Sequence, residues 1–300
     1  MTIGDWLSIN RSELPEGEAI LLLSFALNRE KAFLLAHPEC PLSQNERALL
    51  DQFGERRRKF EPLSYITGEK EFFGLPFLVT RATLIPRPET EILVEYVLDR
   101  IKEQRTGNDG QGTKKISLID IGTGSGCIPI SIMATLREKN HELLPHIRCL
   151  AADISAEALV VAERNADHHG VLPFISFQKS DLLSDIPDSF FQAPSLILTG
   201  NLPYLSKEIY LSSPDDVRLY EPQSALQGDE SDGTTLIIEL LRQYIGKKTP
   251  SSSYFLILEI SPEQGGFLLK QGKELFPRSE TRLIPDLSGR NRFLIIRNRA

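Results

Sequence analysis

The sequence has few cysteines, and they lie far apart. Cys40, Cys127 and Cys149 include no Cys-x-x-Cys pair. Disulfide-stabilised domains need an even set of cysteines, and zinc modules need closely spaced Cys and His residues. We therefore expect three reduced thiols, no disulfide framework and no metal site.

The sequence also lacks a long apolar run and an excess of positive charge. It has no stretch of about eighteen apolar residues that could span a membrane, and residues 1–6 lack the charged and then apolar pattern of an export signal. It carries 34 Lys and Arg against 41 Asp and Glu, a formal net charge of −7. Proteins that bind nucleic acid through its phosphates usually carry a basic surface. We expect a cytoplasmic protein with no membrane partner and no direct nucleic-acid substrate.

What the sequence does contain is enough apolar material for a large core. The 300 residues are 41% hydrophobic and 25% charged, which is an ordinary balance for a globular protein. This length exceeds the usual size of one domain, so we expect two domains in a monomeric chain.

The first sixty residues have the pattern of a small helical domain. Apolar residues recur at helical intervals over residues 18–37 and again over 43–60, where Ser43 and Glu46 have the spacing of a capping box. The second segment ends in a basic run, Arg-Arg-Arg-Lys, at residues 56–59. We interpret this run as a solvated helix end, although it could also contact RNA or an acidic protein.

The rest of the chain has an α/β pattern. Residues 65–80 are rich in β-branched and aromatic residues between glycines, which predicts a β-hairpin linking two domains. From residue 115 onward, apolar strands alternate with helices, which predicts a mostly parallel sheet covered on both faces. A short turn at residues 286–289 should make the final strand antiparallel. Residues 107–115, rich in Gly, Asn and Asp, predict a surface loop.

A glycine-rich turn follows the first strand of this sheet. Residues 120–126 read Asp-Ile-Gly-Thr-Gly-Ser-Gly, and the three glycines let a ligand approach the backbone at the start of the next helix. This spacing differs from the Gly-x-Gly-x-x-Gly of dinucleotide-binding proteins. Asp120 would repel a pyrophosphate, but it suits the ammonium group of S-adenosylmethionine.

Acidic residues at the ends of the next strands complete a candidate donor site. We expect Asp153 to accept hydrogen bonds from both ribose hydroxyls, and Asp181 to accept one from the adenine amino group beside Leu182. Alone, the glycines could form a tight strand-to-helix junction in some other α/β protein. The predicted donor-binding residues are Asp120, Gly122, Thr123, Gly124, Ser125, Gly126, Asp153, Ile154, Asp181, Leu182 and Asn201.

A second motif, Asn201-Leu202-Pro203-Tyr204, follows the apolar run of residues 195–198. An Asn side chain, a backbone carbonyl and an aromatic ring at the end of a buried strand can hold an NH2 group bonded to an sp2 carbon, as in glutamine or adenine. The lone pair of that nitrogen is delocalised and must be aimed at the reacting carbon. Two acceptors that bind both N–H hydrogens can aim it. The two motifs together predict methyl transfer to a planar nitrogen.

With both motifs present, the chain resembles the release-factor glutamine N5-methyltransferases almost from end to end. Residues 84–91, Leu-Ile-Pro-Arg-Pro-Glu-Thr-Glu, are the most specific part, because general methyltransferases lack them. The other segments that carry the resemblance are residues 63–68 (LSYITG), 120–126, 201–204 and 221–226 (EPQSAL).

The resemblance implies an α/β fold: a Rossmann-like, seven-stranded, S-adenosylmethionine-dependent methyltransferase domain after a small helical domain and a β-hairpin linker. We place the helical, substrate-recognition domain at residues 1–62, the linker at 63–82 and the methyltransferase domain at 83–300. The resemblance also implies the substrate. This is the glutamine of the Gly-Gly-Gln loop in peptide chain release factors, methylated on N5 in support of translation termination.

The acceptor motif departs from the family at one position. The family usually has Asn-Pro-Pro-Tyr, and Leu202 replaces the first proline. The family uses the backbone carbonyl of this position, which Leu202 still supplies, and Pro203 favours an extended conformation at Leu202. We expect the Asn201 side chain and the Leu202 carbonyl to accept the two amide hydrogens, and Tyr204 to pack against the amide plane.

Three charged residues have more than one possible role. Arg87 and Glu89 either fasten a lid over the donor or contact the substrate backbone, or they form an interdomain ion pair. Glu221 either orients the Asn201 loop or supplies a negative charge at the start of a nearby turn.

Two other functions stay open at this stage. An adenine-N6 nucleic-acid methyltransferase would hold a flipped base in the same way. Its recognition domain should be basic, whereas residues 1–80 hold nine Lys and Arg against twelve Asp and Glu, a net charge of −3. The other is a non-catalytic binding module with a methyltransferase fold, and the presence of Asp153, Asn201 and Tyr204 argues against it.

Overall fold

The computed structural model describes residues 1–14, 16–105, 115–247 and 253–298, and these form two compact units. The first unit comprises residues 1–69 and 213–220, and the second comprises 70–212 and 221–300. Of the surface loop predicted at residues 107–115, all but the last residue lie outside the described residues.

The first unit consists of short helices around an apolar core of its own. Its core includes the fully buried side chains of Trp6, Leu22, Leu34 and Leu50. The helices are α1 (Ile3–Asn10), α2 (Glu16–Leu27), α3 (Lys31–Ala36), α4 (Gln44–Arg58), α5 (Leu63–Thr67) and α10 (Asp215–Arg218).

Of two predicted details of this unit, one is confirmed and the other is not. The capping box at the start of α4 is confirmed, since Ser43 and Glu46 bond each other's backbone N–H groups. The single helical segment predicted over residues 18–37 is instead divided between α2 and α3. The break occurs at Asn28, which has a φ of 49°, a left-handed conformation that Asn tolerates better than most residues.

The basic run at the end of α4 is paired within the first unit. Arg57 bonds Glu18 at 2.6 Å and so joins α4 to α2. This differs from the solvated helix end inferred from the sequence, because each basic side chain has a carboxylate partner. The pairs are Arg56–Glu61, Arg57–Glu18, Arg58–Glu13 and Lys59–Glu55. The run therefore offers little unbalanced positive charge for RNA.

The predicted β-hairpin is present but shorter than its sequence pattern. Residues 63–67 form α5, which ends at Gly68 with a φ of 78°. Strands β1 (Glu69–Phe72) and β2 (Leu75–Leu78) then pair through a turn in which Phe73 and Gly74 both have positive φ, as a two-residue hairpin turn of type I′ requires.

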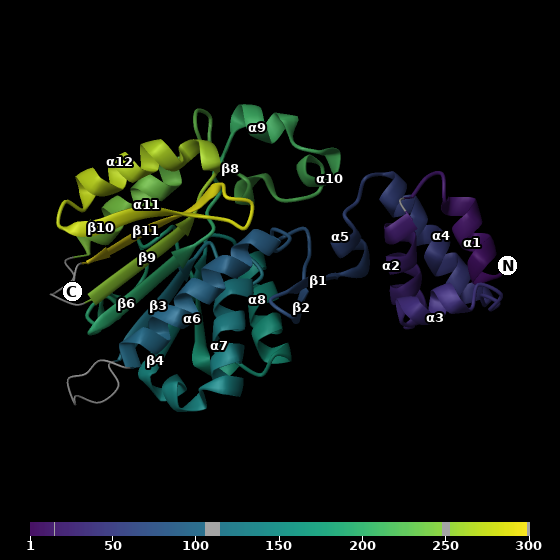
Figure 1. The fold of residues 1–300 in the computed structure, drawn as a ribbon, viewed down its shortest axis with the longest axis horizontal. Coiled ribbons are helices and arrows are strands. Elements are labelled where there is room, and N and C mark those ends of the chain that lie inside the picture. Colours follow the sequence, from purple (N-terminus) through teal and green to yellow (C-terminus); the bar gives the residue numbers. More distant parts are fainter. Residues whose placement is uncertain (15, 106–114, 248–252, 299–300) are drawn as a thin grey trace. The chain divides into compact units, whose positions relative to one another are not determined.

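The second unit is built on the seven-stranded sheet that the family resemblance implied, which confirms the α/β fold. The strand order is β10-β11-β9-β6-β3-β4-β5 (Figure 1). Neighbouring strands are parallel except at β11, which runs antiparallel to both β9 and β10. The strands are β3 (Ile116–Ile121), β4 (Ile147–Asp153), β5 (Ile175–Lys179), β6 (Ser195–Gly200), β9 (Ser253–Glu259), β10 (Ser279–Pro285) and β11 (Asn291–Asn298).

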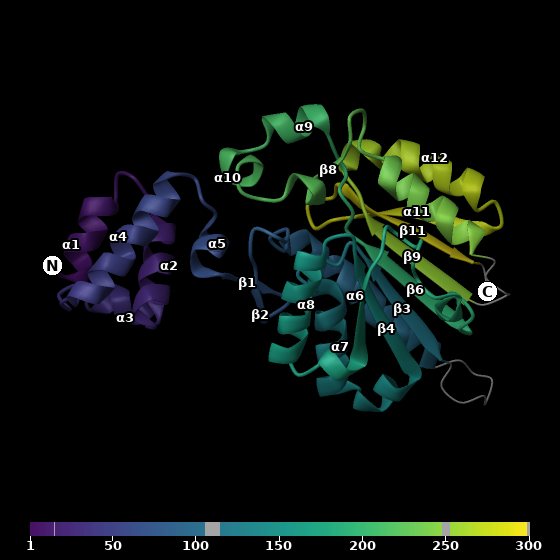
Figure 2. The same cartoon turned by 180° about the vertical axis from the view of Figure 1, so that it is seen from behind.

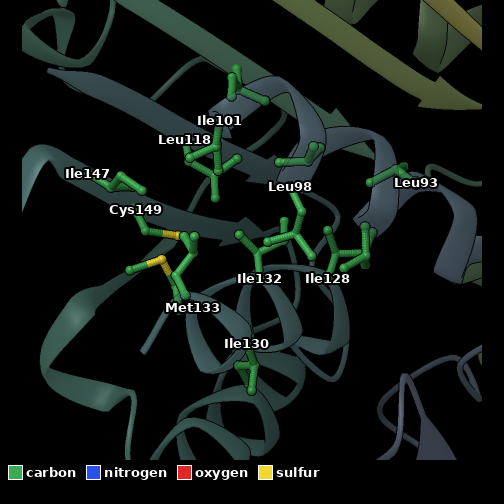
Figure 3. Packing of buried hydrophobic residues seen from close by; sticks show 14 of the residues in the cluster. Leu93, Leu98, Ile101, Leu118, Ile128, Ile130, Ile132, Met133, Ile147 and Cys149 are labelled. Carbon is green, nitrogen blue, oxygen red and sulfur yellow. The ribbon is translucent and has the colours of Figure 1, made fainter. Parts of the chain in front are cut away.

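Helices cover both faces of this sheet, as Figures 1 and 2 show. Helices α6 (Glu91–Arg105), α7 (Cys127–Lys139) and α8 (Ala156–His168) lie on one face, and α11 (Thr235–Gly246) and α12 (Gly265–Leu275) lie on the other. Alternate residues of β3 enter different cores. Leu118 packs with Leu98 of α6 and Met133 of α7 (Figure 3), whereas Ile119 belongs to the cluster that includes Leu240 of α11.

Short elements complete the second unit. They are α9 (Lys207–Ser212), β7 (Leu205–Ser206), β8 (Gln227–Asp229) and the 3-10 turns η1 (Pro88–Thr90), η2 (His141–His146), η3 (Leu172–Phe174), η4 (Asp188–Phe190), η5 (Gln223–Ala225) and η6 (Pro262–Gln264). Among the helices of the described residues, none is long and apolar enough to cross a membrane.

Candidate active site

A cavity of about 690 Å³ lies in the second unit, where the chain leaves β3, β4, β5 and β6. Its volume is typical of a small-molecule site. Most of the predicted site residues line it: Arg87, Gly122, Thr123, Gly124, Ser125, Asp153, Ile154, Asp181, Leu182, Asn201, Leu202 and Pro203. As far as the described residues show, Glu89, Asp120, Gly126 and Tyr204 are not part of the lining.

The glycine turn needs its glycines for backbone conformation and for space. Gly122, Gly124 and Gly126 have φ values of 70°, 55° and 79°, which residues with a side chain rarely adopt. A Cβ on Gly126 would lie 2.7 Å from Ile130 Cδ1 and 3.1 Å from Ala162 Cβ, so this glycine lets α7 and α8 pack closely. A Cβ on Gly124 would meet nothing within 4 Å, which leaves open space on that part of the turn.

Asp153 holds the turn and still has capacity for a ligand. Its two carboxylate oxygens accept hydrogen bonds from the backbone N–H groups of Gly124 (2.8 Å) and Ser155 (2.9 Å). Each oxygen of an ionised carboxylate has further lone pairs, so both can accept a hydroxyl as well. Burial raises the pKa of Asp153, and these backbone hydrogen bonds act in the opposite direction.

Two apolar side chains, those of Ile154 and Leu182, line the same cavity as Asp153. Ile154 is 59% exposed although it lines the cavity. Leu182 is buried with a φ of 50°, a conformation that costs about 1 kcal/mol or more for a residue with a Cβ. Asp181, which precedes it, is exposed at the cavity wall. The backbone is therefore strained at Leu182, a residue that lines the cavity.

Asp120 lies near the end of β3 and is buried. We expected its carboxylate to face the donor's ammonium group, and in the structure the residue is 1% exposed. Its Oδ1 accepts a hydrogen bond from the Thr199 hydroxyl at 2.6 Å. Burial raises the pKa of Asp120 to about 7. Asp120 does not line the cavity, and its contact with the donor's ammonium group stays a prediction.

Asn201 is held by residues that the sequence analysis did not identify. Its Nδ2 donates to Thr90 Oγ1 at 3.2 Å, and the Thr90 hydroxyl donates to Glu259 Oε2 at 2.6 Å. Thr90 lies inside the Pro-Arg-Pro-Glu-Thr segment that carries the family resemblance. Glu259 is an acidic residue at the end of an otherwise apolar strand, a signal that could have marked it.

Tyr204 also bonds this network rather than lining the cavity. Its hydroxyl donates to Glu259 Oε1 (3.3 Å) and accepts from Arg292 (3.2 Å), while Gln264 bonds its backbone carbonyl at 2.7 Å. The expected packing of the Tyr204 ring against a substrate amide is therefore not visible in the cavity lining. These contacts fix the bend that follows Asn201.

Leu202 fills space under the glycine turn. Its side chain is 4% exposed and belongs to the apolar cluster that includes Leu198 and Leu258. A Cβ on Gly122 would lie 3.0 Å from Leu202 Cδ2. The leucine that replaces the usual proline thus packs the acceptor loop against the donor turn.

Arg87 pairs with Glu221 and not with Glu89. Arg87 donates to Glu221 Oε1 at 2.6 Å, and the Ile85 N–H donates to Oε2 at 3.0 Å. All three residues belong to the second unit, so the pair is not interdomain. It joins two segments that both line the cavity, residues 81–87 and 222–227, and Glu89 is exposed.

A seven-stranded sheet with a glycine turn after β3, an acidic residue after β4 and an Asn-x-Pro motif after β6 defines a Rossmann-like methyltransferase domain. Comparison with known proteins narrows this class. Residues 7–68 match the family model described as the PrmC N-terminal domain. The chain is 35% identical over 284 residues to the release factor glutamine methyltransferase of Koribacter versatilis, covering 94% of this chain and 90% of the relative.

A second relative, the release factor glutamine methyltransferase of Chlorobaculum tepidum, is 38% identical over 212 residues, 71% of this chain and 68% of the relative. The chain therefore belongs to the release factor glutamine methyltransferase family, and it is an enzyme.

Among solved structures, the human Mettl16 catalytic domain in complex with hairpin 6 of the MAT2A 3′UTR is similar with a TM-score of 0.51. That match has 17% identity and covers 85% of this chain and 81% of that chain, so it shows the fold alone.

The close packing at Gly126 gives a stability prediction. Gly126→Ala should lower the free energy of unfolding by about 2 kcal/mol, because it combines an unfavourable φ with contact against Ile130 and Ala162. Gly246→Ala is the matched control: this glycine ends α11 with nothing within 4 Å, so alanine there should be neutral or slightly stabilising. Urea unfolding followed by circular dichroism measures both. Equal stability of the two variants would contradict the account of the turn.

The raised pKa of Asp120 gives a prediction for pH dependence. Between its ordinary value of 3.8 and about 7, folded Asp120 keeps a proton that the unfolded chain loses. Its contribution to stability is therefore complete below pH 3.8 and is lost as the pH rises towards 7. Relative to Asp120→Asn, which does not titrate, the wild-type free energy of unfolding should decline over this window. A difference between the two proteins that does not vary with pH would show that Asp120 titrates normally.

Proposed function

We propose that this protein transfers a methyl group from S-adenosylmethionine to N5 of the glutamine in the Gly-Gly-Gln loop of a peptide chain release factor, in support of translation termination. The observation that carries the proposal is the orientation of Asn201. Because its Nδ2 is bound to Thr90, its Oδ1 is left to accept a hydrogen bond at the cavity wall. A carbonyl oxygen in this place can accept a hydrogen bond from the NH2 group of a primary amide substrate.

The residues at the cavity fit the proposed donor. Asp153 has lone pairs for two ribose hydroxyls, and Ile154 and Leu182 offer apolar surfaces for an adenine ring, with Asp181 placed for its amino group. The open space at Gly124 lies at the start of α7, where the methionine portion would reach. When bound, the donor supplies a methyl group on a positively charged sulfur.

The acceptor residues aim a weak nucleophile. Asn201 Oδ1 and the Leu202 backbone carbonyl accept the two N–H hydrogens of the substrate amide, which turns its lone pair towards the methyl group. Positioning of this kind contributes on the order of several kcal/mol. The same two carbonyl dipoles stabilise the positive charge that develops on nitrogen, and the proton leaves afterwards. Tyr204, held by Glu259 and Arg292, keeps the Asn201 bend in place.

A protein substrate fits the first unit better than a nucleic acid. The basic run of α4, its strongest candidate for phosphate contact, is neutralised by four carboxylates. This lack of unbalanced positive charge favours a release factor as the substrate. It argues against adenine in a nucleic acid, which was the alternative after the sequence analysis. With a release factor as the substrate, we expect the reaction to take place in the cytoplasm. We also expect the protein to act as a monomer.

Removal of the Asp153 carboxylate should weaken donor binding. Asp153→Ala should cost roughly 2–3 kcal/mol of binding free energy, because two ribose hydroxyls lose a charged acceptor. Asp153→Asn, which keeps one acceptor oxygen, should fall between the alanine variant and the wild type. Titration calorimetry with S-adenosylmethionine provides the measurement, with circular dichroism to check the fold. An unchanged affinity in the alanine variant would remove Asp153 from the donor site.

Truncation of Asn201 should block methyl transfer without affecting donor binding. We expect Asn201→Ala to lower the single-turnover rate on an intact release factor by about 100-fold or more, since one of the two aiming acceptors is lost. Asn140→Ala is a control, because Asn140 ends α7 and does not line the cavity. Rates would be taken at saturating donor, with mass spectrometry of the Gly-Gly-Gln peptide. Near-normal transfer by Asn201→Ala would refute the assignment, and no methylation by the wild type would refute the proposed function.

A further inference from the structure

Three neighbouring strands bring a buried polar network to the side of the cavity. In the pairing of β6 with β9, Gly200 lies opposite Leu258, so Asn201 leaves the sheet next to Glu259. In the pairing of β9 with β11, Glu259 lies opposite Phe293, which places Arg292 beside it. Thr90, from the turn that begins α6, completes the network. Glu259 is 0% exposed and Thr90 is 1% exposed.

With Glu259 ionised, the donors and acceptors of this network fall into one arrangement. Arg292 donates to the Tyr204 oxygen, so the Tyr204 proton is directed to Glu259 Oε1. Arg292 also lies 3.6 Å from the same carboxylate oxygen. The other oxygen, Oε2, accepts the Thr90 proton at 2.6 Å. Burial raises the pKa of Glu259, but Thr90 and Tyr204 both donate to it and the Arg292 guanidinium lies beside it, and these three neighbours favour the ionised carboxylate.

The direction of the Thr90 hydroxyl decides the orientation of Asn201. A threonine hydroxyl has one hydrogen and can accept further hydrogen bonds. Since that hydrogen is committed to Glu259, the oxygen can only accept from Asn201. The NH2 end of the Asn201 amide must then face Thr90, at the observed 3.2 Å, and its oxygen faces the other way. If the amide flipped, two oxygens would face each other inside the protein, and an NH2 group would be presented to the NH2 group of the substrate.

We propose that Thr90, directed by Glu259, is a positioning residue that fixes the side-chain amide of Asn201 with its oxygen towards the substrate amide. This inference rests on the proposed function, because it concerns how the same acceptor site recognises an amide nitrogen. Thr90 acts through Asn201, and its hydroxyl has no proton left to give to the substrate. It follows that removing the hydroxyl should matter only while the Asn201 side chain is present.

The test compares Thr90→Val with Thr90→Ser, in the wild type and in the Asn201→Ala background. Valine keeps the shape and removes the hydroxyl, whereas serine keeps the hydroxyl. Thr281→Val is the matched control: on β10, Thr281 has a buried hydroxyl with no partner in the described residues and lies outside the cavity lining. Single-turnover methylation of the release factor is measured at saturating donor, together with donor affinity and thermal unfolding.

We expect Thr90→Val to lower the single-turnover rate by roughly 10-fold to 100-fold with donor affinity unchanged, an effect typical of losing a supporting hydrogen bond. Thr90→Ser should restore most of the rate, and Thr281→Val should match the wild type. In the Asn201→Ala background, Thr90→Val should cost less than about twofold, because the group it orients is gone. A rate unaffected by Thr90→Val, or an equal loss in both backgrounds, would overturn the proposal.

A spectroscopic measurement keeps the inference separate from catalysis. With 15N-labelled asparagine, the Asn201 side-chain NH2 signals are identified by their absence in Asn201→Ala. They should shift in Thr90→Val and in Glu259→Met, and stay near their wild-type positions in Thr90→Ser and Thr281→Val. Unmoved signals in Thr90→Val would refute the hydrogen bond. If the wild type does not methylate the release factor, the proposed function fails, whereas these signals still decide how Asn201 is oriented.

Discussion

The site depends on the parallel arrangement of β3, β4 and β6. Because these strands run in the same direction and in register, Ile121 lies opposite both Ala152 and Gly200. The residues that follow them, the glycine turn, Asp153 and Asn201, must then emerge at one edge of the sheet. Donor and acceptor groups that are eighty residues apart in the sequence line the same cavity for this reason. The apolar cores on both faces hold that register.

Buried polar groups then give this edge its chemistry. Glu259 and Asp120 are both almost inaccessible, and burial raises the pKa of each. Hydrogen bonds from Thr90 and Tyr204 to Glu259, and from Thr199 to Asp120, offset part of the cost of burying a carboxyl group. The Glu259 carboxyl holds Thr90, which holds Asn201, and the Asp120 carboxyl joins β3 to Thr199 of β6. Neither needs to touch a substrate to matter for the geometry of transfer.

The sequence predicted the sheet, the glycine turn and the capping box at Ser43, because apolar periodicity and turn residues are local signals. Most of the site residues that it predicted line the cavity, since motifs at strand ends converge in a parallel sheet. It missed the Thr90–Glu259 contact and the Glu221 partner of Arg87, which join residues 169 and 134 positions apart. The motif did not tell how deeply the Asp120 carboxylate is buried. Asn28 broke a helix whose apolar pattern continued through it.

The central claim is that the methyl group reaches a planar amide nitrogen of a protein. The most direct measurement uses a donor with a 13C-labelled methyl group and an intact release factor, followed by NMR and tandem mass spectrometry of the digested product. The account predicts one labelled methyl group, on the side-chain nitrogen of the Gly-Gly-Gln glutamine, where it couples to the single remaining amide hydrogen. Label on any other atom of the release factor, or transfer to adenine in RNA when both substrates are offered, would contradict it.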